Sequence, residues 1–157
     1  MNKLTLTLVF LRRDGQVLLA MKKRGFGVNR WNGVGGKIEK DETLDRALVR
    51  ESREEIGVTP VHYEKSADIK FNEYFKGQPT VMHVHVYSCT KWEGKPTESE
   101  EMRPKWFDID SVPYKDMWPD DPFWLPQVLA GDKVVANFTL DKNDKIISHE
   151  INTVKQL

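Results

Sequence analysis

The sequence has 157 residues, of which 31% are charged, and its 24 lysines and arginines balance 24 aspartates and glutamates. This balance leaves no overall field that would recruit a nucleic-acid polymer or a membrane surface. The single cysteine, Cys89, excludes an internal disulfide framework and fits a reducing compartment. We interpret it as a core side chain rather than a nucleophile.

The length predicts one compact domain over residues 1–157, and the mixture of strand and helix patterns predicts an α+β fold class. Near the N-terminus, apolar residues alternate with threonines and are followed by Arg12 and Arg13. This pattern indicates a strand rather than a signal peptide or a membrane span. We therefore expect a monomer of the cytoplasm, or of the nucleus or mitochondrial matrix if the source is eukaryotic.

The first predicted elements are strands over residues 4–10 and 16–23, joined by a turn at Asp14-Gly15. A basic cluster, Lys22 to Arg24, follows, and then a loop that carries one aromatic, Phe26. Such a cluster is either the solvated end of a strand or, beside a metal site, part of a binding site for a polyphosphate, and we give both interpretations equal weight.

A glycine-rich segment, RWNGVGG at residues 30–36, comes next. It has neither the Walker spacing nor the dinucleotide-binding fingerprint. Its position directly before an acidic helix is more informative. Glycines let the backbone approach a ligand closely, so a carbonyl here can complete the coordination shell of a hard cation.

The acidic helix is predicted to start near residues 41–43 and to end at Gly57, a good residue for a helix C-terminus. Its apolar stripe begins at Leu44. Glu51, Glu54 and Glu55 continue that stripe, within about 90° of the Leu44 direction. Three carboxylates beside the core would repel one another unless a cation compensates them, so the pattern predicts a metal site.

The alternative for these carboxylates is a solvated acidic helix end paired with arginines, which is common for charges at helical spacing. It does not explain why the carboxylates extend an apolar stripe. Arg50 lies at the side of the helix, where it can pair with a carboxylate and hold it in place.

The second half begins with strands predicted over residues 67–75 and 80–89, joined by residues 76–79. His83 and His85 share one face of the second strand and can ligate a transition metal. No cysteine or third histidine accompanies them, so we favour a structural role.

Further strands are predicted over residues 103–109, 133–140 and 145–153, and a helix is predicted from Pro122 to Gly131. The segment before that helix contains Trp118, Asp120 and Asp121. On spacing alone we favour a helix N-terminus, with Asp121 as its cap and Trp118 packing against it.

The spacing from Gly36 to Val58 resembles the Nudix box, Gly-x5-Glu-x7-Arg-Glu-aliphatic-x-Glu-Glu-x-Gly-aliphatic, with Ser52 in place of the bulky aliphatic residue. The segments MKKRGFG, RWNG, EMRP and KDMWPDD also resemble the mammalian-type MutT homologues, which are oxidised purine nucleoside triphosphate pyrophosphatases. The resemblance covers most of residues 4–130 and implies the Nudix fold, a mixed β-sheet sandwiched between helices. The hairpin over residues 71–82 is two residues longer than the family pattern, which leaves the lining of the base pocket there open.

The resemblance implies a reaction in which water attacks a nucleoside triphosphate and releases the monophosphate and pyrophosphate, with Mg²⁺, or Mn²⁺ in its place, as cofactor. It assigns the metal to the Gly35 carbonyl and to Glu51, Glu54, Glu55 and Glu101, and the four carboxylates form the catalytic set. One of these carboxylates deprotonates the attacking water. We favour Glu55, although the sequence does not decide between them.

The substrates implied are oxidised purine nucleoside triphosphates such as 8-oxo-dGTP and 2-hydroxy-dATP, together with methylated purine triphosphates. The residues expected to bind them are Thr7, Lys22, Phe26, Asn32, Val34, Gly35, Gly36, Lys37, Trp118, Asp120 and Asp121. The resemblance implies that Trp118 stacks on the base and that the two aspartates hydrogen-bond to the edge of the base.

Two adjacent aspartates in an aromatic pocket would not both ionise easily, so we expect one of them to be protonated. By hypothesis, exchange of that proton admits purines with different edge patterns. Two other functions are compatible with these residues. One is a Nudix hydrolase for another compound, such as ADP-ribose, a dinucleoside polyphosphate or a methylated purine nucleotide, and the other is a nucleotide sensor without turnover. The intact set of helix carboxylates argues against the sensor.

Overall fold

The computed structural model describes residues 2–157, and its central feature is a nine-stranded mixed sheet. The elements, in chain order, are β1 (Asn2–Arg13), β2 (Gln16–Lys22), β3 (Trp31–Asn32), β4 (Val34–Lys37), α1 (Leu44–Ile56), β5 (Thr59–Phe75), β6 (Gln78–Glu93), β7 (Met102–Asp108), α2 (Asp121–Leu129), β8 (Lys133–Leu140) and β9 (Ile146–Val154). Two single 3₁₀ turns, Ile109–Ser111 and Tyr114–Asp116, connect β7 to α2.

The three predicted hairpins are present: β1 with β2, β5 with β6, and β8 with β9. β1 pairs with β2 only beside their turn, then continues between β4 and β6, parallel to β6. A second parallel pair joins β5 to β8. The β5–β6 turn contains only Lys76 and Gly77, both with positive φ, so Gln78 and Pro79 belong to β6 and not to the connection predicted.

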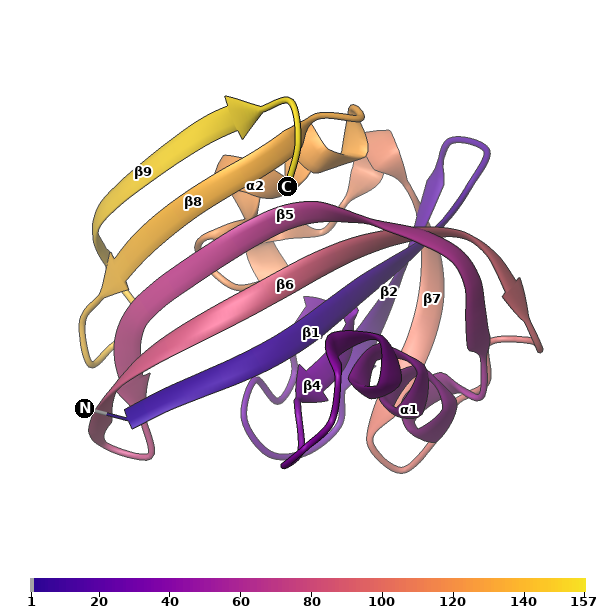
Figure 1. Cartoon of the computed structure of the whole chain (residues 1–157), viewed down its shortest axis with the longest axis horizontal. Helices are drawn as coiled ribbons and strands as arrows, with labels where there is room; N and C mark the ends of the chain where they lie inside the picture. Colours follow the sequence, from indigo (N-terminus) through magenta and orange to yellow (C-terminus); the bar gives the residue numbers. More distant parts are fainter. Residues whose placement is uncertain (1) are drawn as a thin grey trace.

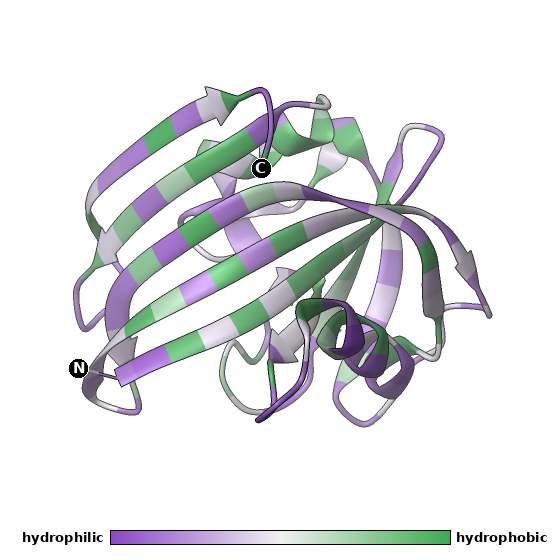
Figure 2. Ribbon diagram, in the orientation of Figure 1, coloured by the Kyte–Doolittle hydropathy of each residue, from purple (hydrophilic) through white to green (hydrophobic). Residues whose placement is uncertain are grey.

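Helices cover both faces of the sheet, which confirms the predicted fold class (Figure 1). On one face, Leu48 and Ile56 of α1 pack in a core with Val9. On the other, Trp124 and Leu125 of α2 belong to a larger core. Figure 2 shows hydrophobic and hydrophilic residues alternating along much of the central strands, whose hydrophobic residues supply both cores. Cys89 is buried in the α1 core, as predicted.

The ends of α1 agree with the prediction. The Thr43 hydroxyl accepts a hydrogen bond from the Arg46 N–H, and Gly57 ends the helix in the left-handed conformation with φ 72°. For α2, Pro122 lies in the first turn as predicted and Pro126 lies inside the helix, but the N-cap residue is Asp120, without a side-chain cap, so the prediction that Asp121 caps this helix is wrong. Within residues 2–157, neither helix is long and apolar enough to cross a membrane.

The rotation of α1 differs from the prediction. Its buried face is centred on Leu48 and Ser52, whereas Leu44 is only partly buried. Ser52 is fully buried, and its hydroxyl donates to the Leu48 carbonyl at 2.7 Å, so this small residue lets the helix lie close to the sheet. The prediction that Glu54 points inward is therefore wrong: its side chain is 62% exposed.

Candidate active site

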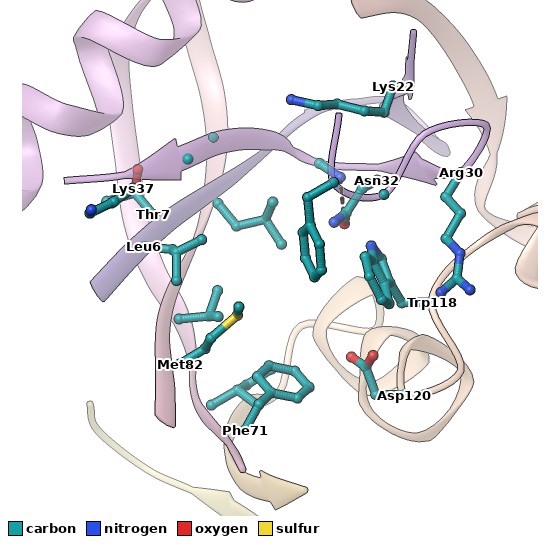
Figure 3. A pocket seen from close by; sticks show the side chains of 18 of the residues that line it. Leu6, Thr7, Lys22, Arg30, Asn32, Lys37, Phe71, Met82, Trp118 and Asp120 are labelled. Atoms are coloured by element: carbon teal, nitrogen blue, oxygen red, sulfur yellow. Dashed lines mark hydrogen bonds between the residues drawn. The ribbon is translucent and has the colours of Figure 1, made fainter. Parts of the chain in front are cut away.

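A pocket of about 290 Å³ lies on the α2 side of the sheet (Figure 3). Alternate strand residues point to this side because successive side chains face opposite sides of a sheet. Its apolar wall consists of Leu4, Leu6, Leu8, Ile69, Phe71, Phe75, Met82 and Val84. Figure 3 shows Leu6, Met82 and Phe71 along one side of the pocket, with Asn32, Trp118 and Asp120 along the other. A flat apolar ligand with a polar edge fits such a site.

Most of the residues predicted to bind substrate line this pocket. They are Thr7, Lys22, Phe26, Asn32, Gly35, Gly36, Lys37, Trp118, Asp120 and Asp121. Val34 is the exception: its side chain is not part of the pocket wall, and the predicted approach of its backbone to the substrate stays a prediction. It is opposite Val9 in the β1–β4 pair, and its side chain is buried in the core beneath α1, because strand alternation turns it away from the pocket.

One end of the pocket carries two buried carboxyls, Asp120 and Asp121, which are 5% and 2% exposed. Asp120 accepts a hydrogen bond from the indole N–H of Trp124 at 2.8 Å, and Asp121 accepts one from the backbone N–H of Trp118 at 3.2 Å. Burial raises the pKa of Asp120 to about 6. Burial and the Asp120 charge raise the pKa of Asp121 well above its usual value. These directions agree with the expectation that one of the two is protonated near neutral pH.

Aromatic rings and one arginine form the wall next to these carboxyls. The Phe26 ring lies 4.9 Å from the Trp118 ring and 5.2 Å from the Phe75 ring. The Arg30 guanidinium lies over Trp118 at 4.1 Å, and its Nη1 is buried without a hydrogen-bond partner. A purine in the pocket would therefore contact the adjacent rings of Phe26 and Trp118, and the Arg30 guanidinium would lie against Trp118.

β4 brings the glycine-rich segment against β1 and joins the pocket to α1. At Gly35 an added Cβ would lie 1.9 Å from the Thr7 carbonyl oxygen, so only glycine permits this strand pairing. At Gly36 an added Cβ would lie 2.9 Å from the Glu51 carboxyl. Gly36 therefore borders both the pocket and the acidic helix, and one extended ligand can reach both.

The buried carboxyl of the acidic helix is Glu55, which is 6% exposed. Its Oε2 has no hydrogen-bond partner. Burial and the neighbouring Glu51 carboxyl raise the pKa of Glu55 to about 9, while Lys22 opposes this effect. Two adjacent carboxyls, one with an orphaned buried oxygen, fit a hard divalent cation, whose preferred ligands are oxygens.

Arg50 holds other carboxylates of this site, as predicted. It donates to Glu42 at 2.7 Å, to Glu51 at 2.8 Å and to Glu54 at 3.3 Å. The hydrogen bonds from Arg50 and from the Glu39 backbone lower the pKa of Glu42 to about 2. Arg50 thus fixes the loop before α1 to the helix and orients Glu51, while Glu54 lies on the solvent side.

The basic cluster is divided between two roles. Lys23 pairs with Glu98 at 2.6 Å and Arg24 pairs with Glu101 at 2.6 Å, so these two side chains are held by the loop before β7. Lys22 lies 3.6 Å from Glu101 and also lines the pocket. Only Lys22 of the three is therefore placed to meet a ligand there, and Glu101 is tied to basic residues rather than to the carboxylates of α1.

The three carboxylates of α1 and Glu101 do not form a tight preformed cluster. Among residues 2–157, the group of potential metal ligands with atoms within 4.8 Å of one another is Asp68, His83 and His85. The Lys65 ammonium lies beside these side chains, 2.7 Å from the Asp68 carboxylate and 2.8 Å from the His85 ring nitrogen. Such a network agrees with the structural role favoured for the histidines, which stays a prediction.

Two charged residues of the pocket were not anticipated from the sequence. Arg30 was part of the glycine-rich segment but had no assigned role, and its position over Trp118 depends on a contact between distant parts of the chain. Glu73 is a buried carboxyl in the wall formed by β5. The signal for Glu73 was available: it shares the apolar face of a predicted strand with Phe71 and Phe75.

Comparison with known proteins gives consistent matches. The NUDIX domain family model matches residues 1–128. An oxidized purine nucleoside triphosphate hydrolase from Danio rerio is 44% identical over 152 residues, covering 97% of this chain and 96% of the relative. The Mus musculus protein of the same name is 44% identical over 148 residues, covering 94% of each chain. The solved structure of a MutT mutator protein from Bacillus halodurans superposes with a TM-score of 0.83 at 24% identity, covering 95% of this chain and 97% of that one, which shows a shared fold.

Proposed function

This chain belongs to the Nudix family, and from this premise we propose that it hydrolyses oxidised purine nucleoside triphosphates to the monophosphate and pyrophosphate, removing them from the nucleotide pool. The observation that supports this most is the continuity of the site. A pocket with buried carboxyls at one end reaches, at Gly36, the carboxylate helix of the Nudix box.

The position of each group suggests how the substrate lies. The purine occupies the apolar pocket against Phe26 and Trp118, with its polar edge toward Asp120 and Asp121. Asn32 adds a further polar contact, since its side-chain oxygen accepts from the Gly33 N–H and its amide nitrogen remains to donate. The triphosphate then extends along residues 35–37 and Lys22 toward α1, where positive charge and glycine backbone are available.

Nudix hydrolases generally need a divalent metal, and we propose Mg²⁺, with Mn²⁺ as a substitute. Glu51, Glu55 and the Gly35 carbonyl would hold it, joined by Glu54 and Glu101. Bound there, the ion would neutralise phosphate charge and lower the pKa of a water molecule. Arg50 keeps Glu51 in position, and Glu55, with an unpartnered oxygen, is our candidate for accepting the proton of the attacking water.

The test is a kcat/KM panel over 8-oxo-dGTP, 2-hydroxy-dATP, methylated purine triphosphates, dGTP and ADP-ribose, with pyrophosphate release as readout. We expect Mg²⁺-dependent release of pyrophosphate, with the oxidised purines preferred to dGTP by at least about tenfold. A preference for ADP-ribose would show that the base pocket has been assigned wrongly. Nucleotide binding without any turnover would instead identify a sensor.

Trp118→Ala should lower kcat/KM for 8-oxo-dGTP by roughly 10- to 100-fold, chiefly through KM, because stacking on an aromatic ring contributes about 1–3 kcal/mol per base. Trp118→Phe should retain most of the activity. Trp106→Ala is a suitable control, because Trp106 packs in the α1 core and is not part of the pocket wall. A loss of kcat/KM that comes entirely from kcat, with KM unchanged, would contradict a stacking role.

A further inference from the structure

One carboxyl interrupts the apolar wall that β5 contributes to the pocket. Ile69, Phe71, Glu73 and Phe75 occupy alternate positions of this strand, and all four line the pocket. Three of them are apolar, as expected for a wall that contacts a base. Glu73 is only 8% exposed and lines the ligand-binding pocket.

The surroundings of Glu73 supply no partner for it within residues 2–157. No hydrogen-bond donor acts on its carboxyl. The hydroxyl of Thr80, its neighbour across the β5–β6 pair, donates instead to the Gln78 carbonyl at 2.9 Å. The side chain is therefore largely buried, but its carboxyl has no hydrogen bond from the protein and its oxygens are not fully enclosed, so a ligand in the pocket can reach them.

The charges near Glu73 are negative. Asp120 directly precedes α2, whose first residue is Asp121, and Asp144 comes from the β8–β9 turn. The cation at this end of the pocket, Arg30, is stacked on Trp118 and lies 3.7 Å from Asp144. Burial, Asp120 and Asp144 together raise the pKa of Glu73 to about 7, so a large fraction of the molecules carry a neutral Glu73 near neutral pH.

We propose that Glu73 is a specificity-determining residue of the base pocket, where its carboxyl hydrogen-bonds an amino or oxo group on the purine edge beside Asp120 and Asp121. The inference rests on the proposed function, because it requires a purine in this pocket. A neutral carboxyl has one donor and one acceptor side by side, which matches the alternating donors and acceptors of a purine edge. A bound purine would give Glu73 the partner that the free protein does not provide.

The experiment compares Glu73→Leu and Glu73→Gln with wild type on 8-oxo-dGTP, 2-hydroxy-dATP and 8-oxo-dITP, which lacks the 2-amino group. Glu73→Leu should lower kcat/KM by roughly 10- to 100-fold for the substrate whose edge group it contacts, mainly through KM, and by less for the others. Glu73→Gln keeps a donor and an acceptor and should stay within about threefold of wild type. Glu64→Leu, the same change at an exposed position of β5, is the matched control.

Thermal unfolding separates this role from a structural one. Because Glu73→Leu removes a partly desolvated carboxyl that lies near the negative charges of Asp120 and Asp144, its Tm should equal or exceed that of wild type. A markedly lower Tm would overturn the proposal. So would substrate ratios for Glu73→Leu that stay within about twofold of the wild-type ratios, while wild type itself is active. If wild type releases pyrophosphate from none of the three compounds, the proposed function fails and the inference fails with it.

Discussion

Glu55→Gln is expected to lower kcat/KM for oxidised purine triphosphates by roughly 10³-fold, which corresponds to about 4 kcal/mol of lost transition-state stabilisation. The side chain is buried, one of its oxygens has no partner, and it lies beside Glu51, so an amide in its place cannot ionise to hold a cation there. Glu51→Gln and Glu54→Gln should also inactivate the enzyme. The measurement is pyrophosphate release at saturating Mg²⁺.

The same variants give a readout that does not depend on turnover. Without metal, Glu55→Gln should unfold at the same temperature as wild type or higher, because the raised pKa of Glu55 keeps its carboxyl protonated near neutral pH and the amide replaces one uncharged group by another. Mg²⁺ should raise the Tm of wild type and have a smaller effect on Glu55→Gln, since a ligand stabilises the form that binds it. Glu64→Gln, an exposed Glu of β5, should behave as wild type in both assays. Full activity of Glu55→Gln would remove the buried carboxylate from the mechanism.

The acidic helix shows which features of a site can be predicted from local sequence. Its caps, Thr43 and Gly57, were predictable because capping depends on residues within one turn. Its rotation was not, because the buried face is decided by packing against β1 and β4. Ser52, which replaces a bulky residue of the family pattern, lies at the centre of that face, and Glu54 is consequently exposed.

The pocket depends still more on contacts between distant segments. The parallel pairs β1–β6 and β5–β8 each join two strands that no turn connects directly, and a sequence pattern does not specify such partners. The residues of the Nudix box and of the WPDD segment could be predicted from the family resemblance. Arg30 could not, and the strand pattern could place Glu73 on an apolar face but not in a base pocket, since both roles appear only when β5, α2 and the segment before β3 surround one cavity.

The pair Asp120 and Asp121 is expected to control which purine is accepted, through a shared proton. The pKa of Asp120 is raised to about 6 and that of Asp121 is raised further from its usual range, so the pair holds one proton near neutral pH and two below about pH 6. Purines with different edges need different donor and acceptor arrangements. The pH profiles of kcat/KM for 8-oxo-dGTP and for 2-hydroxy-dATP should therefore differ. Asp120→Asn should remove the change near pH 6, and it should lower kcat/KM for one substrate at least about tenfold more than for the other. Identical profiles for the two substrates in both proteins would count against this mechanism.

Protein stability reports on the same proton without substrate. Since the folded-state pKa of Asp121 lies above its unfolded value, the native protein holds more protons than the unfolded chain once the pH exceeds about 4. The free energy of unfolding contributed by this group therefore falls as the pH rises from about 4 toward its folded-state pKa. In Asp121→Asn the side chain at this position is uncharged at every pH. The free energy of unfolding of this variant should therefore rise relative to wild type across that range, whereas that of Asp110→Asn, a change at an exposed position, should not. A difference in Tm between Asp121→Asn and wild type that stays constant from pH 5 to pH 8 would show that Asp121 carries no such proton.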